Sequence, residues 1–435
     1  MTLDRDTIDR RTVLRTLGVG GIAGIAGCTG SGGDGGDGGG DGDGGDSTTA
    51  SNDGGSGGGG SSGDAEITLG LQADLTGPLS TYGFWFERVL NGYVAELNDA
   101  DNGLNLELVV EDTATDGKQG ATAFRKLAQQ HEADFVIGSF SSGVNLATNP
   151  LAKQLKVPYF PSGSAPSTTG ADGNRWVVRT AHNITQQAYL GVEWAVENLG
   201  TKWTVVYQDY AFGQQWLAAL KEFLSGKGEI IAEIPVPIGT TDLNSYLNKV
   251  PDETEVLFSA LILPSSINFL QQSADLNVPG QRFGDISSIE GVDIADIESA
   301  GQGASFLTGL PPALDSEANA HLREVAQVES AEENLVRQYW VAYEALSFIV
   351  KAVMESGWQS SDDHQSFIEW FETSPSVTES MEFPQGDKFI RGADHQAYMN
   401  RYISRISGTE LETVAELELN EAPTEAEVDF TQESF

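Results

Sequence analysis

The sequence predicts an α/β protein with two doubly wound lobes, each built around a mainly parallel sheet. From Ala65 onward, short apolar segments of strand character alternate with longer segments whose apolar residues recur at helical spacing. The alternation restarts after Arg179-Thr180 with a second set of similar size. A repeated order of strand and helix is typical of parallel sheets covered by helices on both faces, so two such sets predict two lobes.

Each set divides into strands and helices by its hydrophobic periodicity. The first predicts strands at 67–73, 104–110, 135–137 and 157–160, with helices near 86–97 and at 119–130 and 144–154. The second predicts strands at 203–207, 229–235 and 256–260, with helices at 214–224, 243–250 and 266–277. After Pro311-Pro312 we expect a long helix at about 332–356, then a strand at 398–406 and an acidic tail.

The first 28 residues are typical of an export signal. Arg10-Arg11 resembles a twin-arginine motif, and the weakly apolar stretch 17–27 is too short and too rich in glycine to span a bilayer. Ile25-Ala26-Gly27-Cys28 resembles a lipobox, in which the cysteine thiol receives lipid, and Cys28 is the only cysteine in the chain. Residues 29–64, rich in Gly, Asp and Ser, predict a disordered tether. We therefore expect a lipoprotein on the outer face of the cytoplasmic membrane.

The composition is strongly acidic. Without residues 1–27 the chain keeps 20 Lys and Arg against 61 Asp and Glu, a net charge of about −41. Such a surface repels nucleic acid and anionic lipid headgroups, so contact with the membrane is expected only through the lipid anchor. Carboxylates in this excess favour a protein adapted to concentrated salt, which we take to indicate a halophilic source. An apolar content of 39% can still build a core, although no cysteine pair is available to brace it.

Three polar loops follow strands of the first predicted sheet. They are 74–83, 138–143 and 161–166, each rich in Gly, Ser or Thr. The carboxyl ends of parallel strands meet at one edge of a sheet, where ligands bind in open α/β folds. Serines before a helix also commonly act as simple caps, so each loop alone has a purely structural alternative. Their shared edge predicts a small-molecule site.

These loops resemble those of the branched-chain amino-acid binding proteins of ABC importers, which have a type I periplasmic-binding fold. The resemblance covers residues 67–406 and rests on the order and spacing of several short motifs. These are Gly77-Pro78-Leu79-Ser80-Thr81-Tyr82-Gly83, Ser162-Gly163-Ser164-Ala165-Pro166, Arg179-Thr180, Asp209-Tyr210-Ala211-Phe212-Gly213 and Gly392-Ala393-Asp394-His395-Gln396. The resemblance implies an exported solute-binding protein.

The resemblance also implies ligand contacts from the first lobe. Ser141 or Ser142 and the hydroxyl of Ser164 would hold the carboxylate and amine of an amino acid, and Tyr82 would lie against its side chain. Ser164 stands where the family has threonine, a difference that leaves the ligand's identity open.

From the second lobe, the resemblance implies that Tyr210 or Phe212 closes over the ligand and that Glu290 pairs with its ammonium group. A carboxylate in a dry cleft needs a cationic partner, and an amino acid supplies one. The alternative is that Glu290 is an ordinary solvated surface residue. Phe212 stands where the family has tyrosine.

The same resemblance implies how the lobes are divided and joined. The first lobe would comprise 65–180 and 313–392, and the second 181–312 and 393–435. Three hinge crossings are expected near 179–183, 310–314 and 391–396, about which the lobes would close on the ligand.

The expected function is delivery of a small amino acid, of branched-chain type, to the permease of an ABC importer. Urea, short amides and aromatic or organic acids remain alternative ligands, and a ligand-sensing receptor module is the alternative from another class. An enzyme is not expected, because the sequence after residue 64 has no cysteine nucleophile, no phosphate-binding Gly-x-x-x-x-Gly-Lys and no closely spaced histidines. We expect neither a cofactor nor a metal.

Overall fold

The computed structural model describes residues 65–290, 292–312, 314, 316–329 and 338–435. These residues belong to the second of the two units into which the chain divides, 61–435. The expected signal, Cys28 and the tether lie outside the described residues, as does part of the expected helix at 332–356.

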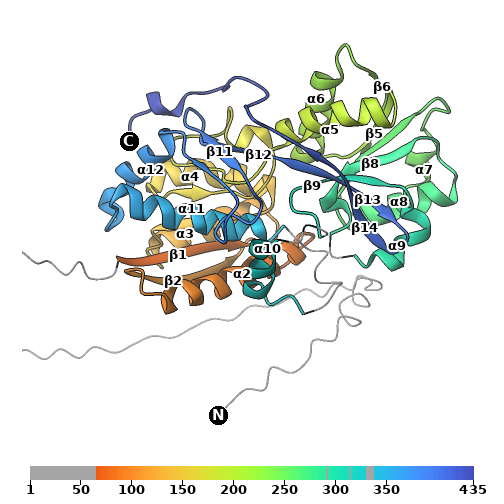
Figure 1. The fold of residues 1–435 in the computed structure, drawn as a ribbon. Coiled ribbons are helices and arrows are strands. Elements are labelled where there is room, and N and C mark those ends of the chain that lie inside the picture. Colours follow the sequence, from red (N-terminus) through yellow and green to blue (C-terminus); the bar gives the residue numbers. More distant parts are fainter. Residues whose placement is uncertain (1–64, 291, 313, 315, 330–337) are drawn as a thin grey trace, which may run out of the picture. The chain divides into compact units, whose positions relative to one another are not determined.

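The first lobe is built on a parallel four-stranded sheet of order β2-β1-β3-β4, drawn in orange and yellow in Figure 1. Its strands are β1 (Ala65–Ala73), β2 (Leu104–Asp112), β3 (Phe135–Gly138) and β4 (Tyr159–Phe160). The helices α2 (Ser80–Asp99), α3 (Gly117–Gln129) and α4 (Ser142–Leu155) connect them. Later segments complete this lobe with α10 (Glu317–Val325), α11 (Trp340–Ser356) and α12 (His364–Glu372). One hydrophobic core joins these helices to the sheet.

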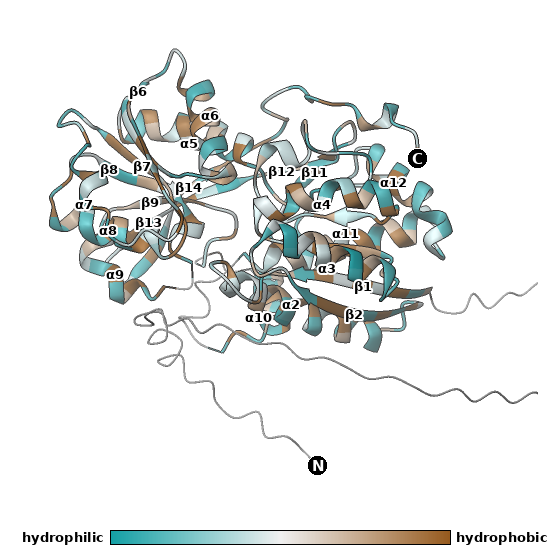
Figure 2. Cartoon of the chain, turned by 180° about the vertical axis from the view of Figure 1, so that it is seen from behind, coloured by the Kyte–Doolittle hydropathy of each residue, from teal (hydrophilic) through white to brown (hydrophobic). Residues whose placement is uncertain are grey.

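The second lobe contains a seven-stranded sheet of order β14-β13-β9-β8-β7-β5-β6. Five strands are parallel: β5 (Lys202–Gln208), β6 (Glu229–Val236), β7 (Val256–Ala260), β8 (Gln281–Asp285) and β9 (Ser305–Thr308). The antiparallel strands β13 (Arg401–Ser407) and β14 (Glu410–Leu417) extend it at one edge. Its helices are α5 (Ile184–Asn198), α6 (Ala211–Leu224), α7 (Asn244–Leu247), α8 (Ser265–Asp275) and α9 (Ile294–Gly301). Brown and teal residues alternate along the helices in Figure 2, as expected where one helical face packs on a sheet.

The predicted strand at 398–406 is two strands in two different sheets. Strand β12 (Gln396–Met399) pairs with β11 (Lys388–Arg391) in a small antiparallel sheet that also contains β10 (Ser376–Val377). After Asn400 the chain continues as β13 in the sheet of the second lobe. The interpretation as one strand was wrong because both halves are extended and largely buried, and nothing in their periodicity marks the change of sheet.

The third passage between the lobes differs from the one expected. That passage lies at Asn400, after the expected range 391–396, because β12 still pairs within the first lobe. The first passage, near 179–183, lies beside β12, since Arg179 and Gln396 form a parallel β-bridge. The second runs between β9 and α10, across the expected range 310–314.

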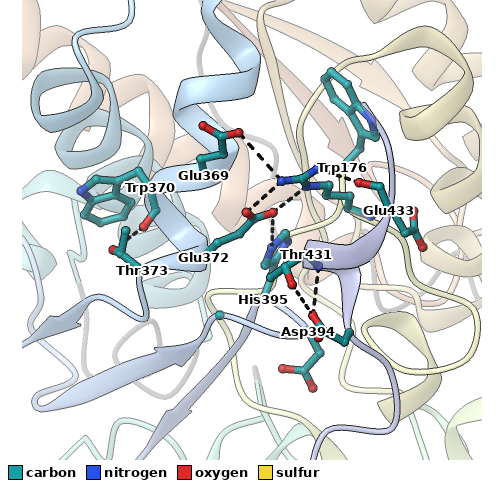
Figure 3. A network of polar contacts seen from close by, with 12 residues as sticks. Trp176, Glu369, Trp370, Glu372, Thr373, Asp394, His395, Thr431 and Glu433 are labelled. Carbon is teal, nitrogen blue, oxygen red and sulfur yellow. Dashed lines mark hydrogen bonds and ion pairs between the residues drawn. The ribbon is translucent and has the colours of Figure 1, made fainter.

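The C-terminal segment 418–435 returns to the first lobe instead of remaining in the second. The amide of Phe430 donates to the carbonyl of Ala393 at 2.7 Å. Glu433 forms an ion pair with Lys153 at 2.7 Å, and its carbonyl accepts from Arg175 at 2.6 Å. Figure 3 shows Glu433 and Thr431 close to His395 and Glu372 in this network. The boundary expected at 392/393 is therefore corrected, and the tail forms a fourth passage between the lobes.

In each lobe, a glycine near the start of a helix lets that helix pack directly against the end of the lobe's first strand. A Cβ atom at Gly83 in α2 would lie 2.3 Å from the carbonyl oxygen of Asp74. A Cβ atom at Gly213 in α6 would lie 2.0 Å from that of Gln208. Both distances are shorter than any tolerated contact, so these two positions require glycine and fix the loops before the two helices.

Candidate ligand-binding site

A small cavity lies where the strand ends of the two lobes meet. The first lobe and the segment before α11 contribute Leu79, Phe140, Ser142, Ser164 and Gln338, the second lobe contributes Tyr210, Phe212, Ile262, Asp285 and Ser287, and His182 comes from the first passage. The cavity measures about 20 Å³. That volume holds about one water molecule, so a larger ligand requires the facing walls to separate. The location agrees with the predicted edge of the first sheet.

Four predicted site residues line the cavity: Ser142, Ser164, Tyr210 and Phe212. Ser142 is the first residue of α4, and Phe212 is the second residue of α6. Tyr210 directly precedes α6 as its N-cap residue. Tyr210 and Phe212 therefore both reach the cavity from the start of α6, opposite the serines of the other lobe. Burial raises the pKa of Tyr210, with a smaller contribution from the carboxyl of Asp74, so its phenol stays protonated.

Two further predicted residues lie just behind the cavity wall. The ring of Tyr82 stacks on Phe140 with centroids 3.9 Å apart, and its hydroxyl donates to the carbonyl of Ser287 in the other lobe at 3.2 Å. The hydroxyl of Ser141 accepts from the amide of Val144 at 3.5 Å as the N-cap of α4. Tyr82 thus supports an aromatic wall, while Ser141 caps a helix.

Glu290 is buried, with 2% of its surface exposed, and lies behind the cavity. The solvated surface alternative does not describe it. After burial itself, the carboxylates of Glu290 and Asp285 contribute most to the raised pKa of Tyr82, so both acids lie near that ring. The guanidinium of Arg401 also neighbours both acids, and burial lowers its pKa to about 10 while they oppose the shift. Arg401 is therefore a buried cationic neighbour of both carboxylates.

Asp285 is a site residue that the sequence analysis missed. It ends β8, a strand that was not predicted, and its Oδ1 accepts from the amide of Ser287 at 2.9 Å. Burial raises its pKa. The signal was available in principle, since an acidic residue follows the short apolar segment at 283–284, but the glycine in that segment weakens the strand pattern.

His182 was predicted only as part of a hinge, yet it lines the cavity. Burial, with Arg401, Arg179 and Lys388 nearby, keeps its pKa well below its usual value, so the imidazole is neutral. Leu79 and Phe140 lie in two of the predicted polar loops but were not singled out, because the prediction favoured the polar side chains there. The remaining lining residues, Ile262, Ser287 and Gln338, lie outside the predicted loops.

The loop after β3 is held by a buried carboxylate. The hydroxyl of Ser139 donates to Asp74 at 2.6 Å, the amide of Phe140 donates to it at 3.0 Å, and Thr113 donates as well. Burial raises the pKa of Asp74, and these donors oppose the shift. Asp74 thereby fixes Phe140 and the start of α4 at the cavity.

Within the described part of the chain, no group of three or more His, Cys, Asp or Glu side chains is placed to hold a metal ion. None of the helices described there is long and apolar enough to cross a membrane.

A cavity at the carboxyl ends of strands from two α/β lobes, with walls from both, defines a two-lobed solute-binding protein. The chain belongs to the periplasmic binding protein family, whose family model matches residues 66–410. This confirms the predicted family and fold class. It also confirms the prediction of a binding protein in place of an enzyme, because members of this extracytoplasmic family bind solutes for ABC transporters.

Among curated proteins, the chain is 31% identical to the Leu/Ile/Val-binding protein BraC3 of Rhizobium johnstonii over 198 residues. The match covers 43% of this chain and about half, 52%, of that protein.

Two solved structures of the same fold hold different ligands. A solute binding protein of an ABC transporter from R. palustris, in complex with 4-hydroxybenzoate, matches with a TM-score of 0.73 and 18% identity, covering 81% of this chain and 97% of that one. The branched-chain amino acid transporter substrate binding protein LivJ from Streptococcus pneumoniae, in complex with isoleucine, matches with a TM-score of 0.68 and 18% identity, covering 81% and 99%. At this identity the likeness concerns the fold and leaves the ligand of this chain open.

Proposed function

We propose that this protein binds a small α-amino acid outside the cytoplasmic membrane and delivers it to the permease of an ABC importer by closing its two lobes. The observation that carries the proposal is that Ser142 and Ser164 line the cavity from one lobe, while the buried Asp285 lines it from the other lobe. The buried Glu290 lies near Asp285. The amide groups at the start of α4 and the serine hydroxyls suit a carboxylate. Asp285 and Glu290 suit an ammonium group. An α-amino acid carries both.

The apolar walls fit the rest of such a ligand. Leu79, Phe140, Phe212 and Ile262 surround the space between the polar ends. A branched aliphatic side chain would bury its surface there at roughly 25 cal/mol per Å². The name of the Rhizobium relative is consistent with this ligand class.

An aromatic acid is the second candidate ligand. The rings of Tyr82 and Phe140 stack in one lobe, and those of Tyr210 and Phe212 in the other lobe have centroids 6.0 Å apart. These aromatic rings could hold a flat ligand ring, and a structural neighbour is bound to 4-hydroxybenzoate. Such a ligand lacks an ammonium group and so brings no positive charge to the carboxylates of Asp285 and Glu290.

A thermal-shift screen in high salt separates these candidates. Leucine, isoleucine and valine are compared with 4-hydroxybenzoate, benzoate and urea, each titrated to saturation. A ligand at 100 times its dissociation constant stabilises the fold by about 2.7 kcal/mol. A shift with α-amino acids supports the proposal, whereas shifts with aromatic acids alone contradict it.

We further propose that a lipid on Cys28 holds the protein at the membrane, with 29–64 as a flexible tether. Tethering would raise the concentration of loaded binder at the permease. The proposal rests on the lipobox resemblance and the family's extracytoplasmic location. Incorporation of labelled fatty acid into the wild-type chain, and its loss in Cys28→Ala, tests it.

A further inference from the structure

A pair of hydrogen bonds connects the two lobes at a point outside the cavity. The side chain of Gln215, in the second lobe, binds Ser167 of the first lobe through both of its polar atoms. Its Nε2 donates to the hydroxyl of Ser167 at 3.0 Å, and its Oε1 accepts from the backbone amide of Ser167 at 3.3 Å. Neither residue lines the cavity. The contact can therefore act on a ligand only through the relative position of the lobes.

The contact joins two elements that carry residues to the cavity. Ser167 lies in the short 3₁₀ helix Pro166–Thr168, three residues after Ser164. Gln215 lies in α6 of the second lobe (Figure 1), three residues after Phe212. Both Ser164 and Phe212 line the cavity. The movement that brings these two side chains together around a ligand is thus the same movement that forms the Ser167–Gln215 contact.

Both elements are fixed within their own lobes. The guanidinium of Arg179 donates to the carbonyl of Ala165 at 2.7 Å and to the hydroxyl of Thr169 at 2.8 Å, two residues before and two residues after Ser167. On the other side, Gly213 lets α6 pack directly against the end of β5. Because neither partner can follow the other independently, breaking the contact requires the lobes themselves to separate.

The energy of such a contact is modest, since Ser167 and Gln215 are both half-buried and would bind water when the lobes separate. A hydrogen bond between neutral groups has a small net effect after this exchange. Two of them together favour the state that makes them by about tenfold. That factor is large enough to change the affinity for a ligand and too small to keep the lobes together permanently.

We propose that Ser167 and Gln215 form an interlobe latch, which sets how tightly the protein holds its ligand without selecting the ligand. A ligand leaves after the lobes separate, so the latch slows release and raises the affinity by the same factor, while the association rate changes little. The two residues are positioning residues. The inference rests on the proposed function, binding by closure of the lobes, and names residues that regulate the closure.

Gln215→Ala tests the latch in the full chain in high salt, with L-leucine, L-valine and 4-hydroxybenzoate as probes. Calorimetry measures the dissociation constants, and stopped-flow fluorescence measures the rates. For every probe that binds the wild-type protein, the dissociation constant should rise by the same factor, about tenfold, through faster release. The melting temperature of the ligand-free protein should not change, because the core of each lobe is intact.

Gln214→Ala is the matched control. Gln214 is the preceding residue of α6, is exposed, and donates to Asp209 of its own lobe at 3.0 Å. It should keep the wild-type affinity and release rate. Ser167→Ala removes one of the two hydrogen bonds, so it should weaken every probe by about threefold and add nothing to Gln215→Ala.

Wild-type release rates in Gln215→Ala would overturn the latch, and so would losses of affinity that differ among the probes by more than about threefold, since a direct contact with the ligand would then be indicated. A lower melting temperature with unchanged release would show a merely structural contact and also overturn it. Failure of the wild-type protein to bind leucine or valine contradicts the proposed amino-acid function instead, and 4-hydroxybenzoate then measures the latch. If none of the three probes binds, both proposals fail.

Discussion

The guanidinium of Arg179 donates to Oε1 of Gln396 at 2.6 Å, and the backbones of the two residues also pair as a β-bridge between the first passage and β12. Arg179 is fully buried, and it further donates to the carbonyls of Gly163 at 2.9 Å and Ala165 at 2.7 Å. Those carbonyls flank Ser164, which lines the cavity. One side chain therefore connects the hinge to a ligand-binding loop.

Arg179→Met should lower the free energy of unfolding by at least about 3 kcal/mol, because several buried acceptors lose their donor at once. The melting temperature reports the loss, and ligand affinity should fall as well because the loop of Ser164 loses its support. Arg125→Met, at an exposed site on α3, is the matched control and should change stability by no more than about 0.5 kcal/mol. Equal melting temperatures for the two variants would contradict the role of Arg179.

The ion pairs of Glu372, in the network that the C-terminal segment joins, predict a loss of stability in acid. Arg175 binds Glu372 through two nitrogens at 2.6 and 2.9 Å, and His395 lies 3.7 Å away. Burial alone would raise the pKa of Glu372, but His395 and Arg175 together lower it to about 2. Since the pKa is lower in the folded state, Glu372 stabilises the fold above its ordinary pKa near 4.5 and loses this contribution as the pH falls toward 2.

Glu372→Gln should therefore remove part of the decrease in melting temperature between pH 5 and pH 2.5, measured at constant salt. Glu369→Gln, one turn earlier on α12 and more exposed, is the control, because Glu369 is 4.0 Å from Arg175. If both variants keep the wild-type pH profile, Glu372 does not contribute to acid sensitivity.

Most of the fold could be predicted because the strands of the parallel sheets are short apolar runs separated by helices of clear periodicity. Strands β8 and β9 escaped prediction because each mixes polar residues with apolar ones, unlike the equally short and apolar β3 and β7. The division of 398–406 escaped it for another reason: the partner strands of Tyr398 and Tyr402 are far apart in sequence, and only tertiary pairing distinguishes them.

The site could be predicted where a residue follows a predicted strand or starts a predicted helix, as Ser142, Ser164 and Phe212 do. The nearness of Arg401 to Asp285 and Glu290 could not, because Arg401 starts a strand far along the chain and comes near these acids only through tertiary packing.

Glu290→Gln should weaken α-amino acid binding by about 10- to 100-fold, because it removes a buried negative charge from the end assigned to the ammonium group. Calorimetry with leucine and glutamine measures the loss, and the binding of 4-hydroxybenzoate, if any, should not weaken. Glu193→Gln, at an exposed position of α5, is the matched control. Unchanged amino-acid affinity in Glu290→Gln would exclude a role for this carboxylate in binding the ammonium group.

Gly213→Ala should disturb the start of α6, because the added methyl group would lie 2.0 Å from the carbonyl oxygen of Gln208. The helix must shift, and Phe212 and Tyr210 move with it, so ligand affinity should fall more than stability. Gly226→Ala is a useful comparison, because its strain would come from a φ of 77° alone and its Cβ would meet no atom within 4 Å. Binding by Gly213→Ala that matches Gly226→Ala would show that the contact is relieved without moving the site.

Cys28→Ala should separate binding from transport. The purified variant should bind its amino acid with wild-type affinity, because the cavity lies entirely in the lobes after residue 64. In cells the released binder is diluted away from the permease, so uptake of labelled solute should fall by about tenfold or more at low substrate concentration. Thr29→Ala, which keeps the lipidation cysteine, should transport normally. Full uptake by Cys28→Ala would mean that delivery does not depend on the anchor, whereas loss of affinity in the purified variant would point to a defect in folding or export.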